Sequence, residues 1–208
     1  MRRSGDGTEK AIALAEIVRA FPANDLSCAS RALIDHLLEH SVREGDFTLK
    51  SGRESRWFVD SKQTACRPAG ILAVADAALE VIPDDATAIG GLTMGADPVA
   101  FGVAAVAATR GRDLRSFSVR KEPKGHGVTG RLAGALQPGD RVVITEDTTT
   151  RGTSLIEAVD VVREFGAEPI LVTLIVDRGD TCAALCEQAG VAYAPLLTAT
   201  DLGFEPGS

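Results

Sequence analysis

The spacing of hydrophobic residues changes twice along the N-terminal third of the chain. Apolar residues three and four positions apart predict one helix over 8–21 and a second that begins after the capping residue Ser27. Two short apolar runs, 47–49 and 57–59, then flank a turn-like basic segment at 50–53. Runs of this length on either side of a Gly-containing turn predict a β-hairpin.

Beyond Pro68 the pattern alternates between helix and strand. Helices are predicted over 69–81, 97–109, 154–165 and 181–188, and strands over 87–91, 114–119, 141–145, 169–176 and 191–197. Several of these strands are almost continuously apolar, which is typical of a parallel sheet that is buried on both faces. The fold class expected is therefore α/β, with a mostly parallel sheet flanked by helices.

The whole chain, 1–208, is expected to form one domain, because no low-complexity linker or internal repeat divides it. We expect an unstructured lead at 1–7, an N-terminal layer of helices and hairpin at 8–65, and the α/β core at 66–200.

Composition and charge narrow the classes of protein. Of the 208 residues 45% are hydrophobic and 25% charged, which argues against a disordered chain or a disulfide scaffold. The 22 basic and 29 acidic residues give a net charge of −7. An acidic chain is a poor candidate for binding nucleic acid or an anionic membrane, so a polyanionic ligand must meet a local basic patch.

The N-terminus and the cysteines indicate a cytoplasmic protein. No uninterrupted apolar segment follows Arg2 and Arg3, so neither a signal peptide nor a membrane span is expected. The four cysteines form no CxxC pair and are predicted to be reduced core residues; they are Cys28, Cys66, Cys182 and Cys186. The last two lie one helical turn apart and should share a buried face.

The segment 142–154 carries the strongest chemical signal. An apolar strand ends in Glu146 and Asp147, a hydroxyl-rich turn with one glycine follows, and a helix then begins. Free backbone N–H groups and the positive end of the helix dipole make such a turn a phosphate site. The two carboxylates suit Mg²⁺ or the hydroxyls of a sugar. The alternative is a capped helix with solvated acids, which the five hydroxyl residues of this turn make less attractive.

A second segment, 117–127, concentrates positive charge in this acidic chain. It contains Arg120, Lys121, Lys124 and His126, interleaved with proline and glycine. Those breakers favour a mobile loop over a strand or a helix. The plainer reading is a solvated basic turn.

These segments resemble the type I phosphoribosyltransferases, and the orotate phosphoribosyltransferases in particular. The segment 142–154 is similar to the loop that binds phosphoribosyl pyrophosphate (PRPP) in that family, although Glu146 replaces the commoner Asp and Arg151 a small residue. The string Arg120-Lys121-Glu122-Pro123-Lys124-Gly125-His126-Gly127 resembles the catalytic loop of the orotate enzymes. Further similarity lies in 47–53, 57–60, 90–97 and the pair Asp177-Arg178.

The resemblance implies a type I phosphoribosyltransferase fold with an N-terminal helix and hairpin hood, and a role for each matching residue. PRPP would be bound by Arg120, Lys121, Lys124, His126, Glu146, Asp147, Thr148, Thr149, Thr150, Arg151, Gly152, Thr153 and Ser154. Orotate would be bound by Lys50, Phe58, Thr150 and Arg178. Catalysis would fall to the four cationic residues of the loop together with Glu146 and Asp147.

The same resemblance implies the reaction, the cofactor and the assembly. Orotate and PRPP would give orotidine 5′-monophosphate and pyrophosphate, a step of pyrimidine biosynthesis, with Mg²⁺ held mainly through PRPP rather than by a protein ligand. The chain would form a homodimer that shares the catalytic loop across its interface, with neither nucleic acid nor membrane as a partner.

Several alternatives stay open or carry less weight. A transferase of the same fold for another base, and a PRPP-sensing regulator without activity, remain. The run His36-Leu37-Leu38-Glu39-His40 fits a zinc-peptidase pattern but lacks a third ligand. Gly125 to Gly130 spells the dinucleotide motif, yet no full helix follows it.

Overall fold

The structure is a computed structural model that describes residues 26–48, 54–124 and 130–207. The predicted lead at 1–7, the predicted helix at 8–21 and the predicted hairpin turn at 50–53 lie outside these ranges. Across the described residues, no helix combines the length and apolarity needed to cross a bilayer.

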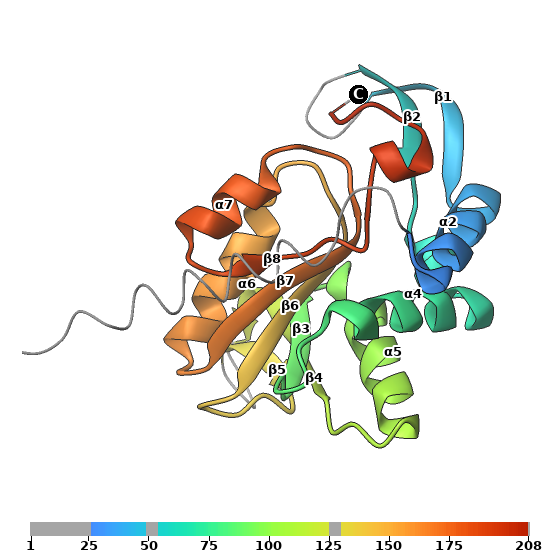
Figure 1. The fold of residues 1–208 in the computed structure, drawn as a ribbon. Helices are drawn as coiled ribbons and strands as arrows, with labels where there is room; N and C mark the ends of the chain where they lie inside the picture. Colours follow the sequence, from blue (N-terminus) through green and yellow to red (C-terminus); the bar gives the residue numbers. More distant parts are fainter. Residues whose placement is uncertain (1–25, 49–53, 125–129, 208) are drawn as a thin grey trace, which may run out of the picture.

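A seven-stranded sheet forms the centre of the described molecule (Figure 1). Its strand order is β5-β4-β3-β6-β7-β8, with β9 also paired to β7. All neighbours are parallel except the antiparallel pair β4–β5. The strands are β3 (Ala88–Leu92), β4 (Arg115–Lys124), β5 (Gly130–Gly134), β6 (Arg141–Thr149), β7 (Glu168–Asp177), β8 (Ala192–Tyr193) and β9 (Leu197–Thr198).

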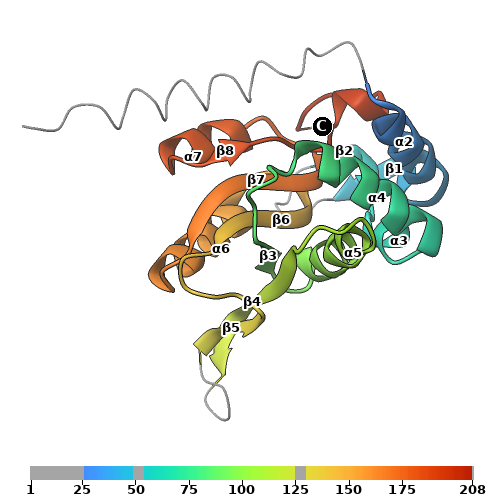
Figure 2. The same ribbon diagram turned by 60° about the horizontal axis from the view of Figure 1, so that its bottom comes forward.

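Helices cover both faces of this sheet, as the continuous apolar strands predict. On one side are α4 (Pro68–Val81) and α5 (Ala96–Thr109), and on the other α6 (Thr153–Glu164) and α7 (Cys182–Gln188) (Figure 2). Neighbouring strand residues point to opposite faces, so Val143 joins the core under α4 and α5 whereas Ile144 joins the core under α6 and α7. The expected α/β class is confirmed.

The N-terminal layer packs on the α4 side of the sheet. It contains α2 (Cys28–His40), the antiparallel hairpin of β1 (Val42–Thr48) and β2 (Glu54–Val59), and the short α3 (Lys62–Ala65). Helix α2 buries Leu33 and Leu37 of the predicted stripe in the same core as Trp57. A short 3₁₀ helix, η1 (Thr200–Leu202), brings the C-terminal segment back to this layer, so the chain ends beside β2 (Figure 1).

The prediction of a loop at the basic segment is wrong for its described part. Residues 120–124 continue β4, which the sequence pattern did not predict. The pairing with β5 is interrupted after Val119 and resumes at Lys124, which lies opposite Gly130. Strand β3 ends opposite Val119, so beyond that residue the two strands form a ribbon that projects from the sheet (Figure 2). Pro123 is tolerated because it lies in this irregular stretch, where the ladder needs no N–H from it.

Two other expectations need correction. The strand predicted over 191–197 is divided into β8 and β9, because Pro195 between them has no N–H to donate to a ladder. Cys182 and Cys186 are buried as expected, but Cys28 and Cys66 are exposed thiols rather than core residues. Their exposure follows from their places at the ends of helices, outside the apolar stripes.

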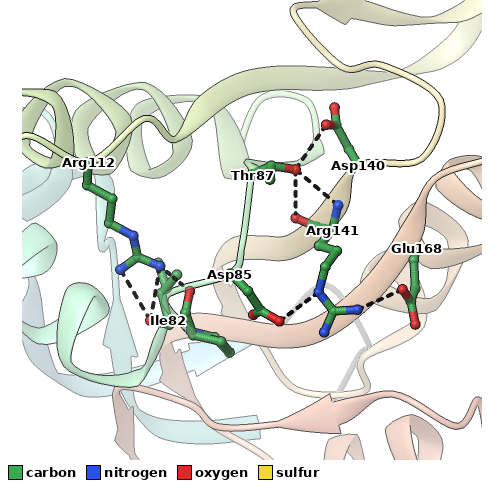
Figure 3. A network of polar contacts seen from close by, with 8 residues as sticks. Ile82, Asp85, Thr87, Arg112, Asp140, Arg141 and Glu168 are labelled. Carbon is green, nitrogen blue, oxygen red and sulfur yellow. Dashed lines mark hydrogen bonds and ion pairs between the residues drawn. The ribbon is translucent and has the colours of Figure 1, made fainter.

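A polar network ties together the amino ends of the central strands (Figure 3). Thr87 Oγ1 donates to Asp140 Oδ1 at 2.9 Å, and the amide of Gln137 donates to Asp140 Oδ2 at 2.7 Å. Arg115 also pairs with Asp140, and Arg141 pairs with the exposed acids Asp85 and Glu168. Because the strands are parallel, this network lies at the edge of the sheet opposite their carboxyl ends.

Candidate active site

The carboxyl ends of β3 and β6 meet where the strand order changes direction. From β3 the chain crosses to β4 on one side, and from β6 it crosses to β7 on the other. Ligands of open α/β sheets bind in the crevice at such a point. Glu146 and Asp147 lie at this end of β6. A Cβ atom at Gly95, in the loop after β3, would overlap the Glu146 carboxylate and lie 2.6 Å from Asp147 Oδ1, so only glycine allows this approach.

The loop between β6 and α6 has the form expected of a phosphate site. Gly152 takes a φ of 74°, in the left-handed region that favours glycine, and donates its N–H to Thr149 Oγ1 at 2.9 Å. Helix α6 then begins at Thr153 with no side-chain cap on its first amides. The positive end of the helix dipole therefore points at a loop whose side chains are neutral hydroxyls and the exposed Arg151.

A cavity of about 560 Å³ opens beside this loop, and residues of the hood form part of its lining. Most of the predicted ligand-binding residues outside the basic segment meet here. Its lining consists of Thr48, Phe58, Val59, Asp60, Lys62, Asp147, Thr148, Thr149, Thr150, Arg151, Ser154 and Arg178. The neighbouring strand, loop and helix positions are occupied by Glu146, Gly152 and Thr153, which are not part of the lining.

Asp147 is held in a cluster of donors that sequence reasoning missed. Lys62, at the start of α3, forms an ion pair with its carboxylate, Ser61 Oγ donates to Oδ2 at 3.0 Å, and the Thr148 amide donates to Oδ1 at 2.9 Å. Burial alone would raise the pKa of Asp147, but the hydrogen bond and charge of Lys62 outweigh it and lower the pKa. Asp147 therefore stays ionised inside the site.

Glu146 has the opposite character from its neighbour. Its side chain is 7% exposed, and its Oε1 accepts the amide of Asp147 at 3.1 Å. Burial, together with the charge of Asp147, raises the pKa of Glu146 to about 8. At neutral pH the pair thus carries mainly one negative charge, on Asp147, and Glu146 is mainly protonated.

Arg178 directly follows the end of β7 and lines the same cavity as Lys62. Its guanidinium is stacked over the indole of Trp57, 4.3 Å from the ring centroid, and Nη2 donates to the Trp57 carbonyl at 3.1 Å. Burial lowers the pKa of Arg178, and its buried Nε has no hydrogen-bond partner among the described residues. A buried cation with an unused donor suits a carboxylate ligand.

The basic segment does not reach this cavity within the described chain. Arg120 Nη1 donates to the carbonyls of Gly130 and Leu132, both at 3.3 Å, which holds its side chain on the ribbon. Lys121 is exposed, and Lys124 is the last residue of β4. Lys50 and His126, predicted for orotate and PRPP, lie outside the described residues.

Lys62 could have been found from the sequence only by asking what neutralises Asp147. It is the lysine nearest the hairpin's end, two residues after Asp60, and its short helix carries no periodic signal. The pairing joins residues 85 positions apart, so local pattern gives no hint of it.

No metal centre is evident from the protein side chains alone. The described residues contain no group of three or more His, Cys, Asp or Glu that could hold an ion. His36 and His40, from the zinc-like motif, contact each other edge-on at 4.5 Å, and His36 Nδ1 lies 3.1 Å from Thr64 Oγ1. The motif is thus part of the packing between α2 and α3.

Comparisons with known proteins place this geometry in a family. No family model matches the chain. The chain is 37% identical over 179 residues to the orotate phosphoribosyltransferase of Nostoc sp., covering 86% of this chain and 87% of that protein. It is 41% identical over 176 residues to the orotate phosphoribosyltransferase of Streptomyces avermitilis, covering 84% and 97%. The chain belongs to the orotate phosphoribosyltransferase family.

The solved structures agree with this assignment. The orotate phosphoribosyltransferase of Mycobacterium tuberculosis, in a crystal structure with PRPP, matches with a TM-score of 0.72 and 32% identity, over 85% of this chain and 99% of that one. The predicted membership of the orotate phosphoribosyltransferases, and with it the type I phosphoribosyltransferase fold, is confirmed. As a member of this family, the chain is a pentosyltransferase.

Proposed function

We propose that the protein transfers the 5-phosphoribosyl group of PRPP to orotate, giving orotidine 5′-monophosphate and pyrophosphate. One observation carries the proposal: a single cavity joins a hydroxyl-rich loop at a helix amino end, an ionised Asp147 and a buried Arg178 with an unused donor. These three features suit the phosphate, the sugar and the carboxylate that the two substrates bring.

The 148–154 loop would bind the 5-phosphate through the first amides of α6 and the hydroxyls around them. Arg151, on the cavity lining, adds a full positive charge next to that phosphate. Asp147, kept ionised by Lys62, would accept hydrogen bonds from the ribose hydroxyls. Glu146 lies next to this carboxylate and, while protonated, can itself donate a hydrogen bond.

Orotate would lie between the hood and the end of β7. The planar guanidinium of Arg178 matches a carboxylate in two-pronged geometry. Phe58, which lines the cavity and is 39% exposed, offers a ring face to the base. Thr150 and Lys50 are proposed as the remaining orotate contacts.

The chemical step separates charge. A ring nitrogen of orotate loses its proton to solvent and bonds to C1 of the ribose, while the bond from C1 to the diphosphate oxygen breaks and its electron pair leaves with pyrophosphate. Cations placed where that negative charge accumulates lower the barrier. We propose this role for Arg120, Lys121, Lys124 and His126, which a projecting ribbon would present to the site of a neighbouring subunit in a homodimer.

Magnesium is proposed as the cofactor, held mainly by PRPP. The commitment of Asp147 to Lys62 and Ser61 supports an ion that arrives with its phosphate ligands. Such an ion would neutralise diphosphate charge. A cytoplasmic location and a part in pyrimidine biosynthesis belong to the same proposal.

The loss of orotate absorbance in the presence of PRPP tests the proposed reaction. Orotate should be consumed only when PRPP is present, and chelation with EDTA should abolish turnover that added Mg²⁺ restores. Uracil and the purine bases serve as comparison substrates. Consumption of one of these but not of orotate would identify a transferase for another base. PRPP binding without turnover of any base would identify a regulator.

Co-expression of two defective variants tests the shared site. Lys124→Ala and Arg178→Ala should each be nearly inactive at low orotate. If the ribbon acts across the interface, mixed dimers contain one intact site, and random pairing should restore roughly a quarter of the wild-type activity. No recovery in verified mixed dimers would mean that each subunit uses its own ribbon.

A further inference from the structure

Three residues far apart in the sequence form a stack behind the orotate end of the cavity. The Arg178 guanidinium lies 4.3 Å from the ring centroid of Trp57 on β2. Phe204, two residues after η1, stacks on the same indole with centroids 4.4 Å apart and an interplanar angle of 4°. The C-terminal segment, the hood hairpin and the end of β7 thus meet at one buried side chain, since Trp57 is 1% exposed.

The C-terminal segment also reaches Arg178 through the backbone. Gly207 donates its N–H to the Arg178 carbonyl at 2.7 Å, while the Arg178 N–H is donated to the Thr149 carbonyl at 2.9 Å. Arg178 is therefore fixed between the phosphate loop on one side and the C-terminal segment on the other. Its side chain is then aligned by the Trp57 ring and by two acceptors of Nη2, the Trp57 carbonyl at 3.1 Å and Ser55 Oγ at 3.3 Å.

In this arrangement, the orientation of the Arg178 guanidinium depends on the position of Trp57. An indole within a strand of a two-stranded hairpin needs a second surface to hold its ring plane, because a hairpin alone is marginally stable. Phe204 supplies that surface in a near-parallel stack. The ring of Phe204 packs against the same core that contains Trp57 and Leu202.

We propose that Phe204 is a positioning residue for orotate, acting through Trp57 on the Arg178 guanidinium. The proposal rests on the proposed function, in which Arg178 meets the orotate carboxylate. It adds that the C-terminal segment sets the affinity for the base while leaving the PRPP end of the cavity unchanged. Phe204 itself touches neither substrate and does not line the cavity.

Kinetics of Phe204→Ala give the first test. Loss of the stacked ring should raise the KM for orotate about fivefold to twentyfold, with kcat and the KM for PRPP changed by less than about twofold. Phe204→Tyr, which keeps the ring, should restore the wild-type KM for orotate, whereas Phe204→Leu should not. Phe165→Ala is the matched control, because Phe165 is a half-exposed phenylalanine at the end of α6, away from the cavity.

Fluorescence gives a readout that does not depend on turnover. Trp57 is the single tryptophan of the chain, so the intrinsic emission reports this indole alone. Phe204→Ala should shift the emission to longer wavelength and increase quenching by acrylamide, and Phe204→Tyr and Phe165→Ala should do neither. If Phe204→Ala fails to fold, the comparison of Phe204→Leu with Phe204→Tyr decides both readouts.

The outcomes separate this proposal from the proposed function. A wild-type protein that consumes no orotate refutes the function, while the emission of Trp57 still tests the stack. A wild-type KM for orotate in a folded Phe204→Ala or Phe204→Leu variant overturns the positioning role. Equal increases in the KM for both substrates would also overturn it, because they would indicate a general loss of structure.

Discussion

Two adjacent carboxylates at the end of β6 show how strongly a residue's surroundings determine its pKa. Glu146 and Asp147 follow one another at the end of β6, and both carboxylates approach Gly95. Only Asp147 is also paired with Lys62 and Ser61. The pKa of Glu146 is raised to about 8 and that of Asp147 is lowered, although both are almost fully buried.

Substitution of Glu146 by glutamine should stabilise the protein at high pH. The pKa of Glu146 is about 8 in the folded state and 4.5 by its ordinary value, so the folded state binds the extra proton. Wild-type stability should therefore fall as the pH rises from about 4.5 to 8, and Glu146→Gln removes this loss. Thermal unfolding at pH 5, 7 and 9 should show a Tm advantage for the variant that grows with pH, by about 2–4 °C for each kcal/mol relieved.

The exposed Glu164, at the end of α6, provides the control for that comparison. Glu164→Gln should leave the pH dependence of Tm unchanged. A difference between Glu146→Gln and wild type that stays constant from pH 5 to 9 would contradict the raised pKa.

Removal of the Lys62 charge should weaken PRPP binding. Lys62→Met leaves the buried Asp147 without its counter-ion, which favours the protonated carboxyl and removes an acceptor for the ribose hydroxyls. The KM for PRPP should rise about tenfold or more, equivalent to about 1.4 kcal/mol, with the KM for orotate little changed. Lys62→Arg should retain most of the affinity. Gln63→Met, on the same short helix, is the control, and a fall in the KM for PRPP would show instead that Lys62 competes with the sugar.

At the scale of elements, the β6–α6 unit and the β4–β5 ribbon differ in how far local sequence determines them. The first unit has an apolar strand, a glycine at a positive φ and an amphipathic helix, all of which local pattern predicts. The ribbon consists of two polar, glycine-containing strands, and each is a strand only because it pairs with the other. Proline and glycine in that segment favour a loop by propensity, and tertiary pairing overrides it.

Truncation of Lys124 tests the function of this ribbon. Lys124→Ala should lower kcat by about 10²-fold or more, because a cation at the departing diphosphate acts mainly in the transition state. The circular dichroism spectrum and Tm should stay close to wild type, since Lys124 is the last residue of β4. Arg110→Ala, which removes an exposed arginine at the end of α5 paired with Asp76, should keep full activity. Wild-type turnover of Lys124→Ala would refute the catalytic assignment of the basic segment.

At the scale of the whole molecule, the two ends of the parallel strands differ in function. The carboxyl edge carries the cavity, and the amino edge carries the network around Asp140 (Figure 3). Two apolar cores lie between them, one on each face of the sheet. Because the two regions lie at opposite ends of the strands, substitutions in the network around Asp140 should change stability without changing substrate binding.

Asp140→Ala should reduce stability without changing the kinetics at moderate temperature. The substitution leaves Arg115, Thr87 and the Gln137 amide without their common acceptor, in a place where Asp140 is 6% exposed. The free energy of unfolding should fall by about 2–3 kcal/mol, lowering Tm by about 4–12 °C. Asp85→Ala, which removes an exposed partner of Arg141, should cost less than about 1 kcal/mol. A Tm loss for Asp140→Ala no larger than that of Asp85→Ala would contradict the importance of this network.

The sequence by itself determined the α/β class, most helices and strands, and the hydroxyl-rich turn between β6 and α6, because these depend on local spacing and on residues that follow one another. It could not determine the Lys62–Asp147 pair, the extension of β4 into a ribbon, or the stack of Phe204, Trp57 and Arg178. Each of these joins segments that are far apart along the chain. Their contacts exist only once the sheet has ordered its strands, so the tertiary structure alone decides which charge, ring or carbonyl each residue meets.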